Sequence, residues 1–200
     1  TQPVRPKNRG MKLQAPPVKR IALAYDIPVF QPVTLKDGTA LEEIRQLSPE
    51  LLVVAAYGRL LPREILELPA KGCINVHSSL LPKYRGAAPI NWAVLNGEEE
   101  TGVTIMYMAQ ELDAGDIIAQ ASTPIDPEET VESVHDRLAG LGARLLVQTV
   151  SRLEAGTAER TPQDGERATY APMLSRELSP IDWTRPAREI HDQIRGLIPW

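Results

Sequence analysis

Asn75, His77 and Asp113 are the residues whose types and spacing best fit a chemical reaction. Asn75 and His77 stand two positions apart, and Asp113 lies in the Asp-Ala-Gly-Asp turn of residues 113–116. An amide N–H can stabilise an oxyanion, and an imidazole with a pKa near ~6.5 can move a proton at neutral pH. A carboxylate can orient that imidazole or accept the proton itself. The three residues predict acyl transfer without a metal.

The elements around these residues predict one shared edge of a sheet. Residues 73–76 form an apolar strand that ends at His77, and alternation along a strand points Asn75 and His77 to one face. Asp113 lies between expected antiparallel strands at 103–108 and 117–120. Alone, His77 fits a structural histidine and Asp113 a turn acid; the combination favours a site. Whether His77 or Asp113 is the base stays open.

Segments with the apolar periodicity of a helix alternate along the chain with segments typical of a strand. This order predicts an α/β fold with a mostly parallel sheet flanked by helices. The expected helices cover about 18–25, 41–47, 62–68, 89–95, 130–153 and 186–195, and the remaining expected strands cover 27–30 and 51–56. Thr130 is the expected cap of the longest helix. The expected apolar face of this helix consists of Val131, Val134, Leu138, Leu141, Leu145, Leu146 and Val150. We expect a catalytic domain over residues 1–160 and a linker over residues 161–200.

Composition narrows the class of protein. A chain of 200 residues with 42% hydrophobic content fits one domain, and it contains neither an apolar run of membrane-spanning length nor a signal peptide. Cys73 is the only cysteine, which excludes an internal disulfide and a cysteine-cluster metal site and fits a reducing compartment. Because it lies in an apolar run, Cys73 is expected to pack in the core.

The first twenty residues differ in charge from the rest. The chain has a net charge of -4, yet this segment has no acid. Its basic residues are Arg5, Lys7, Arg9, Lys12, Lys19 and Arg20, and four prolines interrupt it. Residues 1–17 are therefore expected to form an extended basic loop that faces a polyanion. A solvated, disordered terminus is the alternative.

A long stretch of the sequence resembles the folate-dependent formyltransferases, and most closely the branch that acts on tRNA. The resemblance rests on residues 75–90, on Glu100 to Met106, and on Leu112 to Asp116. It implies a Rossmann-like fold, 10-formyltetrahydrofolate as the formyl donor, and the α-amine of initiator methionyl-tRNA as the acceptor. The pattern of Asn75, His77 and residues 79–82 is shared across the family. The opening loop and residues 85–90 resemble the tRNA-directed branch.

The resemblance also implies roles for individual residues. Asn75, His77 and Asp113 would be catalytic, and no metal is expected. The expected folate contacts are Ser79, Leu80, Leu81, Pro82, Tyr57 and Gly58. The expected tRNA contacts are Arg5, Lys7, Arg9, Lys12 and Arg85.

The chain departs from the family at both ends. It lacks the N-terminal strands and the C-terminal barrel domain of the family, so we expect a fragment that is unstable or inactive by itself. The whole enzyme is expected to be a monomer in the bacterial cytosol or an organelle matrix, without membrane contact. Two alternatives remain: a formyltransferase acting on the amine of a nucleotide sugar, and a truncated nucleic-acid-binding fragment without turnover.

Overall fold

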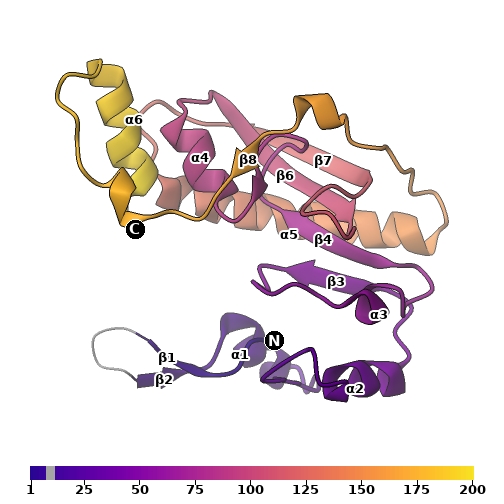
Figure 1. Cartoon of the computed structure of the whole chain (residues 1–200). Helices are drawn as coiled ribbons and strands as arrows, with labels where there is room; N and C mark the ends of the chain where they lie inside the picture. The colour runs from indigo at the N-terminus through magenta and orange to yellow at the C-terminus, as the bar shows by residue number, and fades with distance from the viewer. Residues whose placement is uncertain (8–11) are drawn as a thin grey trace. The chain divides into compact units, whose positions relative to one another are not determined.

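The computed structural model describes residues 1–7 and 12–200, which divide into two units. The first unit is Thr1–Leu52 with Ala56–Gly72, and the second is Val53–Ala55 with Cys73–Trp200. Figure 1 labels most of the helices and strands of both. All three predicted catalytic residues belong to the second unit.

The described part of the first unit contains a small hairpin and short helices. These are β1 (Arg5–Lys7) paired antiparallel with β2 (Lys12–Gln14), then α1 (Pro17–Ala24), α2 (Thr39–Leu47) and α3 (Arg63–Leu66). The helices match the predicted ones, and α1 begins at Pro17 because proline suits a first helical turn. The strand predicted at residues 27–30 is wrong, since this described segment is irregular. Pro28 lacks the N–H that a strand partner would need.

A four-stranded sheet forms the centre of the second unit, in the order β3-β4-β6-β7. Its strands are β3 (Leu52–Ala55), β4 (Cys73–His77), β6 (Glu100–Tyr107) and β7 (Ile117–Pro124). β6 pairs antiparallel with both β4 and β7. The sheet therefore has more antiparallel pairing than expected. The link from β6 to β7 is shorter than the roughly twelve residues that a parallel crossover requires.

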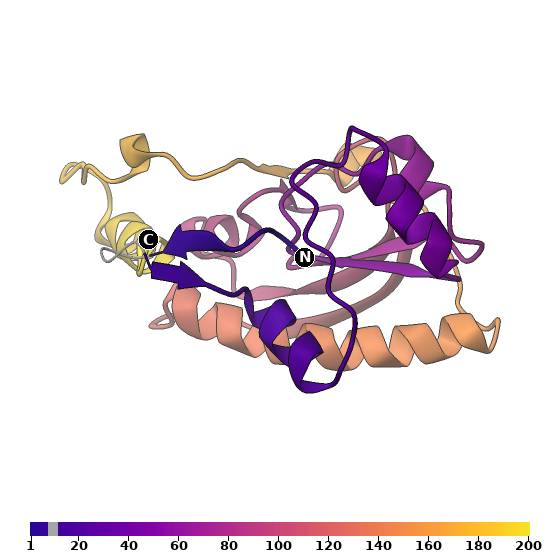
Figure 2. The same cartoon turned by 90° about the horizontal axis from the view of Figure 1, so that it is seen from below.

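One long helix packs along the sheet. α5 (Val131–Glu154) contacts β6 and β7, and Figures 1 and 2 show it running alongside the strands. Val134 and Leu138 are buried, as the apolar face predicted. At Gly142 a Cβ would lie 3.3 Å from a methyl of Val76, so this glycine permits the close helix-to-sheet approach. Thr130 precedes the helix, but its side chain makes no capping hydrogen bond.

Residues 161–200, expected to form a linker, supply further elements to the second unit. β8 (Tyr170–Ala171) pairs parallel with β5 (Arg85–Gly86), and α6 (Ala187–Leu197) packs on α4 (Pro89–Leu95). A short 3₁₀ turn, Gly165–Arg167, precedes β8, and a second, Arg176–Leu178, lies between β8 and α6. The buried Arg195 guanidinium lies 2.7 Å from Asp192 and donates to the carbonyl of Glu129 at 3.1 Å. These bonds hold α6 against the start of α5.

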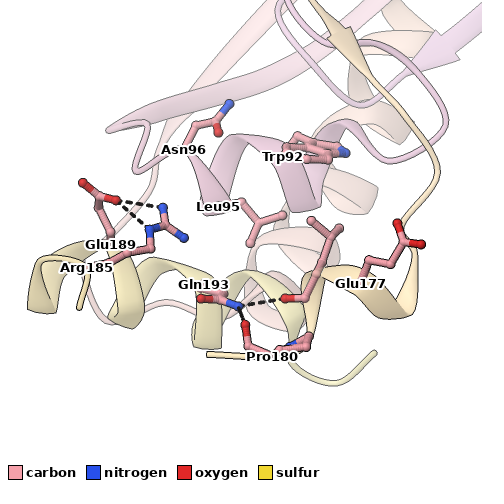
Figure 3. Close-up of a pocket in the computed structure, with 9 residues that line it drawn as sticks. Trp92, Leu95, Asn96, Glu177, Pro180, Arg185, Glu189 and Gln193 are labelled. Carbon is pink, nitrogen blue, oxygen red and sulfur yellow. Dashed lines mark hydrogen bonds and ion pairs between the residues drawn. The ribbon is translucent and has the colours of Figure 1, made fainter. Parts of the chain in front are cut away.

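A pocket of about 230 Å³ lies between α4 and α6 (Figure 3). Trp92 and Leu95 line one side, and Gln193 lines the other. The Gln193 amide donates to the carbonyls of Leu178 at 2.8 Å and Pro180 at 3.0 Å, so its nitrogen is already hydrogen-bonded within the protein. None of the three predicted catalytic residues lines this pocket. It is thus separate from the site described below. Among the described helices, none is long and apolar enough to cross a membrane.

Cys73 is buried, as predicted, and this makes its reactivity testable. The side chain is 3% exposed, and burial raises the pKa of the thiol to about 11. A pKa above the usual range leaves almost no thiolate at pH 8, and only the thiolate is nucleophilic. We expect a disulfide reagent at pH 8 to leave Cys73 unmodified in the folded protein. The same reagent in urea, where the thiol is exposed, should label it fully; labelling at the free-cysteine rate without urea would contradict the burial.

Candidate active site

His77 is the last residue of β4, and a backbone carbonyl sets its tautomer. The side chain is 6% exposed, and Nε2 lies 2.9 Å from the carbonyl oxygen of Tyr84. A carbonyl oxygen only accepts, so Nε2 carries a proton and donates it. Nδ1 lies 3.6 Å from Oδ2 of Asp113, which is beyond hydrogen-bond distance. Neutral His77 therefore keeps its lone pair on Nδ1, near the carboxylate. Asp113 does not set the tautomer, which was one of its expected roles.

Hydrogen bonds from its backbone N–H and its phenol hold Tyr84 in place. They thereby fix the carbonyl group that accepts from His77. Its φ is +61°, in the left-handed region, and its N–H donates to the hydroxyl of Thr169 at 2.9 Å. The phenol donates to Glu98 at 2.7 Å and accepts from Asn96 at 3.1 Å. Burial raises the pKa of Tyr84 to about 12, so the phenol remains a donor at neutral pH. A rigid Tyr84 in turn fixes the imidazole ring.

Asp113 lies in the loop between β6 and β7, as predicted, and the backbone of this loop brings its carboxylate to His77. Its φ is +50°, and its side chain is 14% exposed. Oδ2, the oxygen nearest His77, accepts the backbone N–H of Gly86 at 2.8 Å. A Cβ at Gly115 would lie 1.8 Å from the carbonyl oxygen of Tyr107, so only glycine fits there. The structure thus places the Asp113 carboxylate beside the His77 ring.

Asn75 shares β4 with His77 and is half-buried. In the pairing of β4 with β6, Asn75 lies opposite Met106 and His77 lies opposite Thr104. Strand alternation directs the side chains of Asn75 and His77 to the same face. Within residues 1–7 and 12–200, the Asn75 side chain has no hydrogen-bond partner. Its N–H groups are therefore available to a ligand oxygen.

The loop after β4, which carries expected folate contacts, is stabilised by its buried side chains. Ser79 is fully buried, and its hydroxyl donates to the carbonyl of Lys83 at 2.6 Å. Leu81 is 3% exposed and belongs to the core. Leu80 and Pro82 are half-buried and keep some accessible surface. Ser79 and Leu81 therefore shape the loop, whereas Leu80 and Pro82 retain surface for a ligand.

Thr104 is buried, and the hydrogen bonds of its hydroxyl stabilise this loop. Its hydroxyl donates to the carbonyl of Ser79 at 2.6 Å and accepts from the N–H of Leu81 at 3.1 Å and the amide of Gln120 at 2.9 Å. Gln120 also donates to the carbonyl of Leu81 at 2.9 Å. One hydroxyl thus links the loop to β6 and β7.

Replacing Thr104 with valine should therefore destabilise the protein. The carbonyl of Ser79 and the N–H of Leu81 each lose a buried hydrogen bond, at about 1–3 kcal/mol for each group left unpaired, whereas the exposed Gln120 keeps its bond to Leu81. We expect urea denaturation to show a loss of roughly 3 kcal/mol in the free energy of unfolding. Thr157→Val removes a hydroxyl from an exposed position and should cost under about 0.5 kcal/mol. Equal effects of the two substitutions would contradict this role.

Arg85 does not lie where a tRNA contact was expected. The residue is 4% exposed; its Nε and Nη2 donate to Oε1 of Gln163 at 3.1 and 2.9 Å, and its Nη1 lies 3.3 Å from Glu111. A guanidinium that is 4% exposed and bonded within the protein presents almost no surface to a phosphate. Arg85 instead connects β5 to the Asp113 loop.

The other expected ligand contacts belong to the first unit. Arg5, Lys7 and Lys12 lie on the β1–β2 hairpin, and Arg9 lies outside the described residues. Tyr57 and Gly58 follow β3, and the Tyr57 carbonyl accepts from Gln2 at 2.6 Å. Their binding roles stay predictions.

Sequence reasoning missed Thr104, Gln120 and Gln163, which support the site. Thr104 and Gln120 stand in alternating strand patterns, where polar residues are common, and Gln163 lies in a polar segment without periodicity. Only contacts between distant segments distinguish them. The described residues contain no group of three His, Cys, Asp or Glu side chains placed to hold a metal ion.

Comparison with known proteins decides the family. Residues 1–150 match the family model described as formyl transferase. The chain belongs to the formyl transferase family. The methionyl-tRNA formyltransferase of Moorella thermoacetica is 60% identical over 200 residues, and that of Pelobacter propionicus is 55% identical over 200 residues. These alignments cover 100% of this chain but 64% and 63% of the relatives, so the chain spans somewhat under two thirds of their length.

A solved formyltransferase shares the fold. The N-formyltransferase of Helicobacter canadensis, in complex with folinic acid and dTDP-3-aminofucose, is 25% identical with a TM-score of 0.69. The match covers 90% of this chain and 63% of that one. The Rossmann-like formyltransferase fold expected from the sequence is thus confirmed, with more antiparallel pairing than expected.

Proposed function

We propose that this chain carries the catalytic site of a methionyl-tRNA formyltransferase, which transfers the formyl group of 10-formyltetrahydrofolate to the α-amine of initiator methionyl-tRNA. The observation that carries the proposal is the geometry of His77, with Nε2–H donating to Tyr84 and Nδ1 3.6 Å from Asp113. The 60% identity to the Moorella enzyme supports the acceptor.

In the proposed reaction the amine nitrogen attacks the formyl carbon, and a tetrahedral intermediate with an oxyanion forms. The free N–H groups of Asn75 donate to this oxygen. Nδ1 of His77 accepts the proton that leaves the amine, because the carbonyl of Tyr84 holds the other proton on Nε2. Asp113 stabilises the resulting imidazolium. The bond from carbon to N10 then breaks, and the imidazolium returns the proton to N10, which gives tetrahydrofolate and formylated methionyl-tRNA.

The donor and the acceptor would use different parts of the chain. Leu80 and Pro82 are the proposed folate contacts of the second unit, and Ser79 and Leu81 shape that loop from inside. No metal takes part. The basic residues before residue 13 would neutralise phosphates of the tRNA, each adding about one unit to the salt dependence of binding.

A direct test offers both classes of acceptor to the product of the complete gene. With 10-formyltetrahydrofolate present, initiator methionyl-tRNA and a nucleotide-linked amino sugar compete, and mass spectrometry identifies the formylated product. We expect formylation of the tRNA alone. Formylation of the sugar alone would overturn the acceptor and favour the alternative suggested by the sugar-bound Helicobacter structure.

The same assay on the isolated 200-residue chain tests the expectation that it is inactive alone. Turnover only by the complete gene product would support that expectation. Sedimentation and fractionation would test the proposed monomeric state and cytosolic or organellar location.

A further inference from the structure

Gln163 uses every hydrogen-bonding position of its side-chain amide. Nε2 donates to the carbonyl oxygens of Asp113 and Gly115, both at 2.8 Å. Oε1 accepts from Nε and Nη2 of Arg85 at 3.1 and 2.9 Å. Carbonyl oxygens only accept and a guanidinium only donates, so the amide cannot be turned over without losing all four bonds.

The backbone that Gln163 holds needs external support. Asp113 has a φ of +50°, in the left-handed region, where a residue with a Cβ is less stable than in the right-handed region. The loop therefore stays in this form only if other bonds oppose relaxation. The Gln163 amide binds the carbonyls on both sides of Ala114 and fixes the peptide planes that set the direction of the Asp113 side chain.

The partner on the other side of Gln163 belongs to the same arrangement. Arg85 is 4% exposed and precedes Gly86, whose N–H holds Oδ2 of Asp113 at 2.8 Å. Gln163 thus connects the segment that binds the carboxylate to the loop that carries it. Reciprocal backbone hydrogen bonds between Ile117 and Thr161, at 2.8 and 2.9 Å, anchor the chain two residues before Gln163.

We propose that Gln163 is a positioning residue that clamps the Asp113 loop and so keeps the carboxylate beside Nδ1 of His77. Among the described residues, the Gln163 side chain hydrogen-bonds to neither His77 nor the side chain of Asp113; it acts through the loop backbone and Arg85. This inference rests on the proposed function, because the loss it predicts is a loss of formyl transfer.

Gln163→Glu tests the clamp at constant size. The carboxylate can still pair with Arg85, but it cannot donate to two carbonyl oxygens and repels them. A displacement of about 1 Å at a reacting group can cost ~100-fold. In the product of the complete gene, we expect kcat to fall about 100-fold while KM for folate and tRNA changes by less than about threefold. Gln148→Glu, the same change on the exposed side of α5, should leave kcat unaltered.

A double-mutant cycle with Asp113→Asn separates positioning from general destabilisation. If Gln163 acts through Asp113, then Gln163→Glu should reduce kcat by less than about threefold in the Asp113→Asn background. An additive loss would overturn the proposal, as would near-normal kcat in Gln163→Glu. Should Gln163→Glu fold poorly, Gln163→Ala removes the same donors without adding charge and must show the same cycle.

The wild-type measurement keeps the two proposals distinguishable. Absence of tRNA formylation by the wild-type protein refutes the proposed function. Normal wild-type formylation with an additive cycle refutes only the role of Gln163.

Discussion

Replacing His77 with alanine should lower kcat for formyl transfer by about 10²–10⁴-fold, the usual contribution of a positioned acid–base group. The substitution removes Nδ1, the atom whose lone pair faces Asp113 at 3.6 Å. It leaves Leu80, Pro82 and Asn75 in place. Folate binding should therefore persist, which calorimetry with tetrahydrofolate would check beside single-turnover transfer.

Because His77 is 6% exposed, its removal creates a cavity, so a second variant is needed. His77→Gln fills most of the space and can still donate to the carbonyl of Tyr84, but it supplies no basic nitrogen. We expect the same loss of transfer from both variants. His135→Ala, on the exposed side of α5, is the matched control and should transfer at the wild-type rate. Near-normal turnover in His77→Gln would refute the assignment of His77.

Replacing Asn75 with alanine should lower kcat by about 10²–10³-fold, equivalent to roughly 3 kcal/mol of lost oxyanion stabilisation. The Asn75 amide bonds to no other described residue, so truncation orphans no buried partner among them. The free energy of unfolding should therefore change by under about 1 kcal/mol. Steady-state kinetics and urea denaturation of the same preparation measure the two quantities.

Asn91 provides the opposite control. Its amide donates to the carbonyl of Gly196 at 2.9 Å and ties α4 to α6. Asn91→Ala should lower the free energy of unfolding by about 1 kcal/mol and leave kcat intact. A large stability loss in Asn75→Ala, with kcat unchanged, would mean that Asn75 is structural.

The parts of the site that could be predicted from the sequence are those determined by residues close together in the chain. Alternation along β4 is a local property, so it already placed Asn75 and His77 on one face. The apolar face of α5 and the burial of Cys73 follow from patterns within a few turns or one strand, and the structure confirms both. The strand predicted at 27–30 is wrong because Pro28, within this apolar run, has no N–H to donate to a neighbouring strand.

Other parts could not be predicted, because they depend on residues far apart in the chain. The resemblance implies a tRNA contact for Arg85, and the residues next to it in sequence do not predict its burial. Its partner Gln163 is 78 positions away, in a segment without periodicity. The antiparallel pairing likewise follows from how β6 lies between β4 and β7, a choice among strand orders that the individual strand patterns leave open.

The sequence by itself determined which groups the site contains: an amide and an imidazole on one strand end and a carboxylate in the following hairpin loop. Only the tertiary structure decided how those groups are held. The Tyr84 carbonyl sets the His77 tautomer, Gly86 fixes the Asp113 carboxylate, and Gln163 holds its loop. Each of these is a directional hydrogen bond between separate segments, and such a bond exists only once packing has brought its donor and acceptor within about 3 Å.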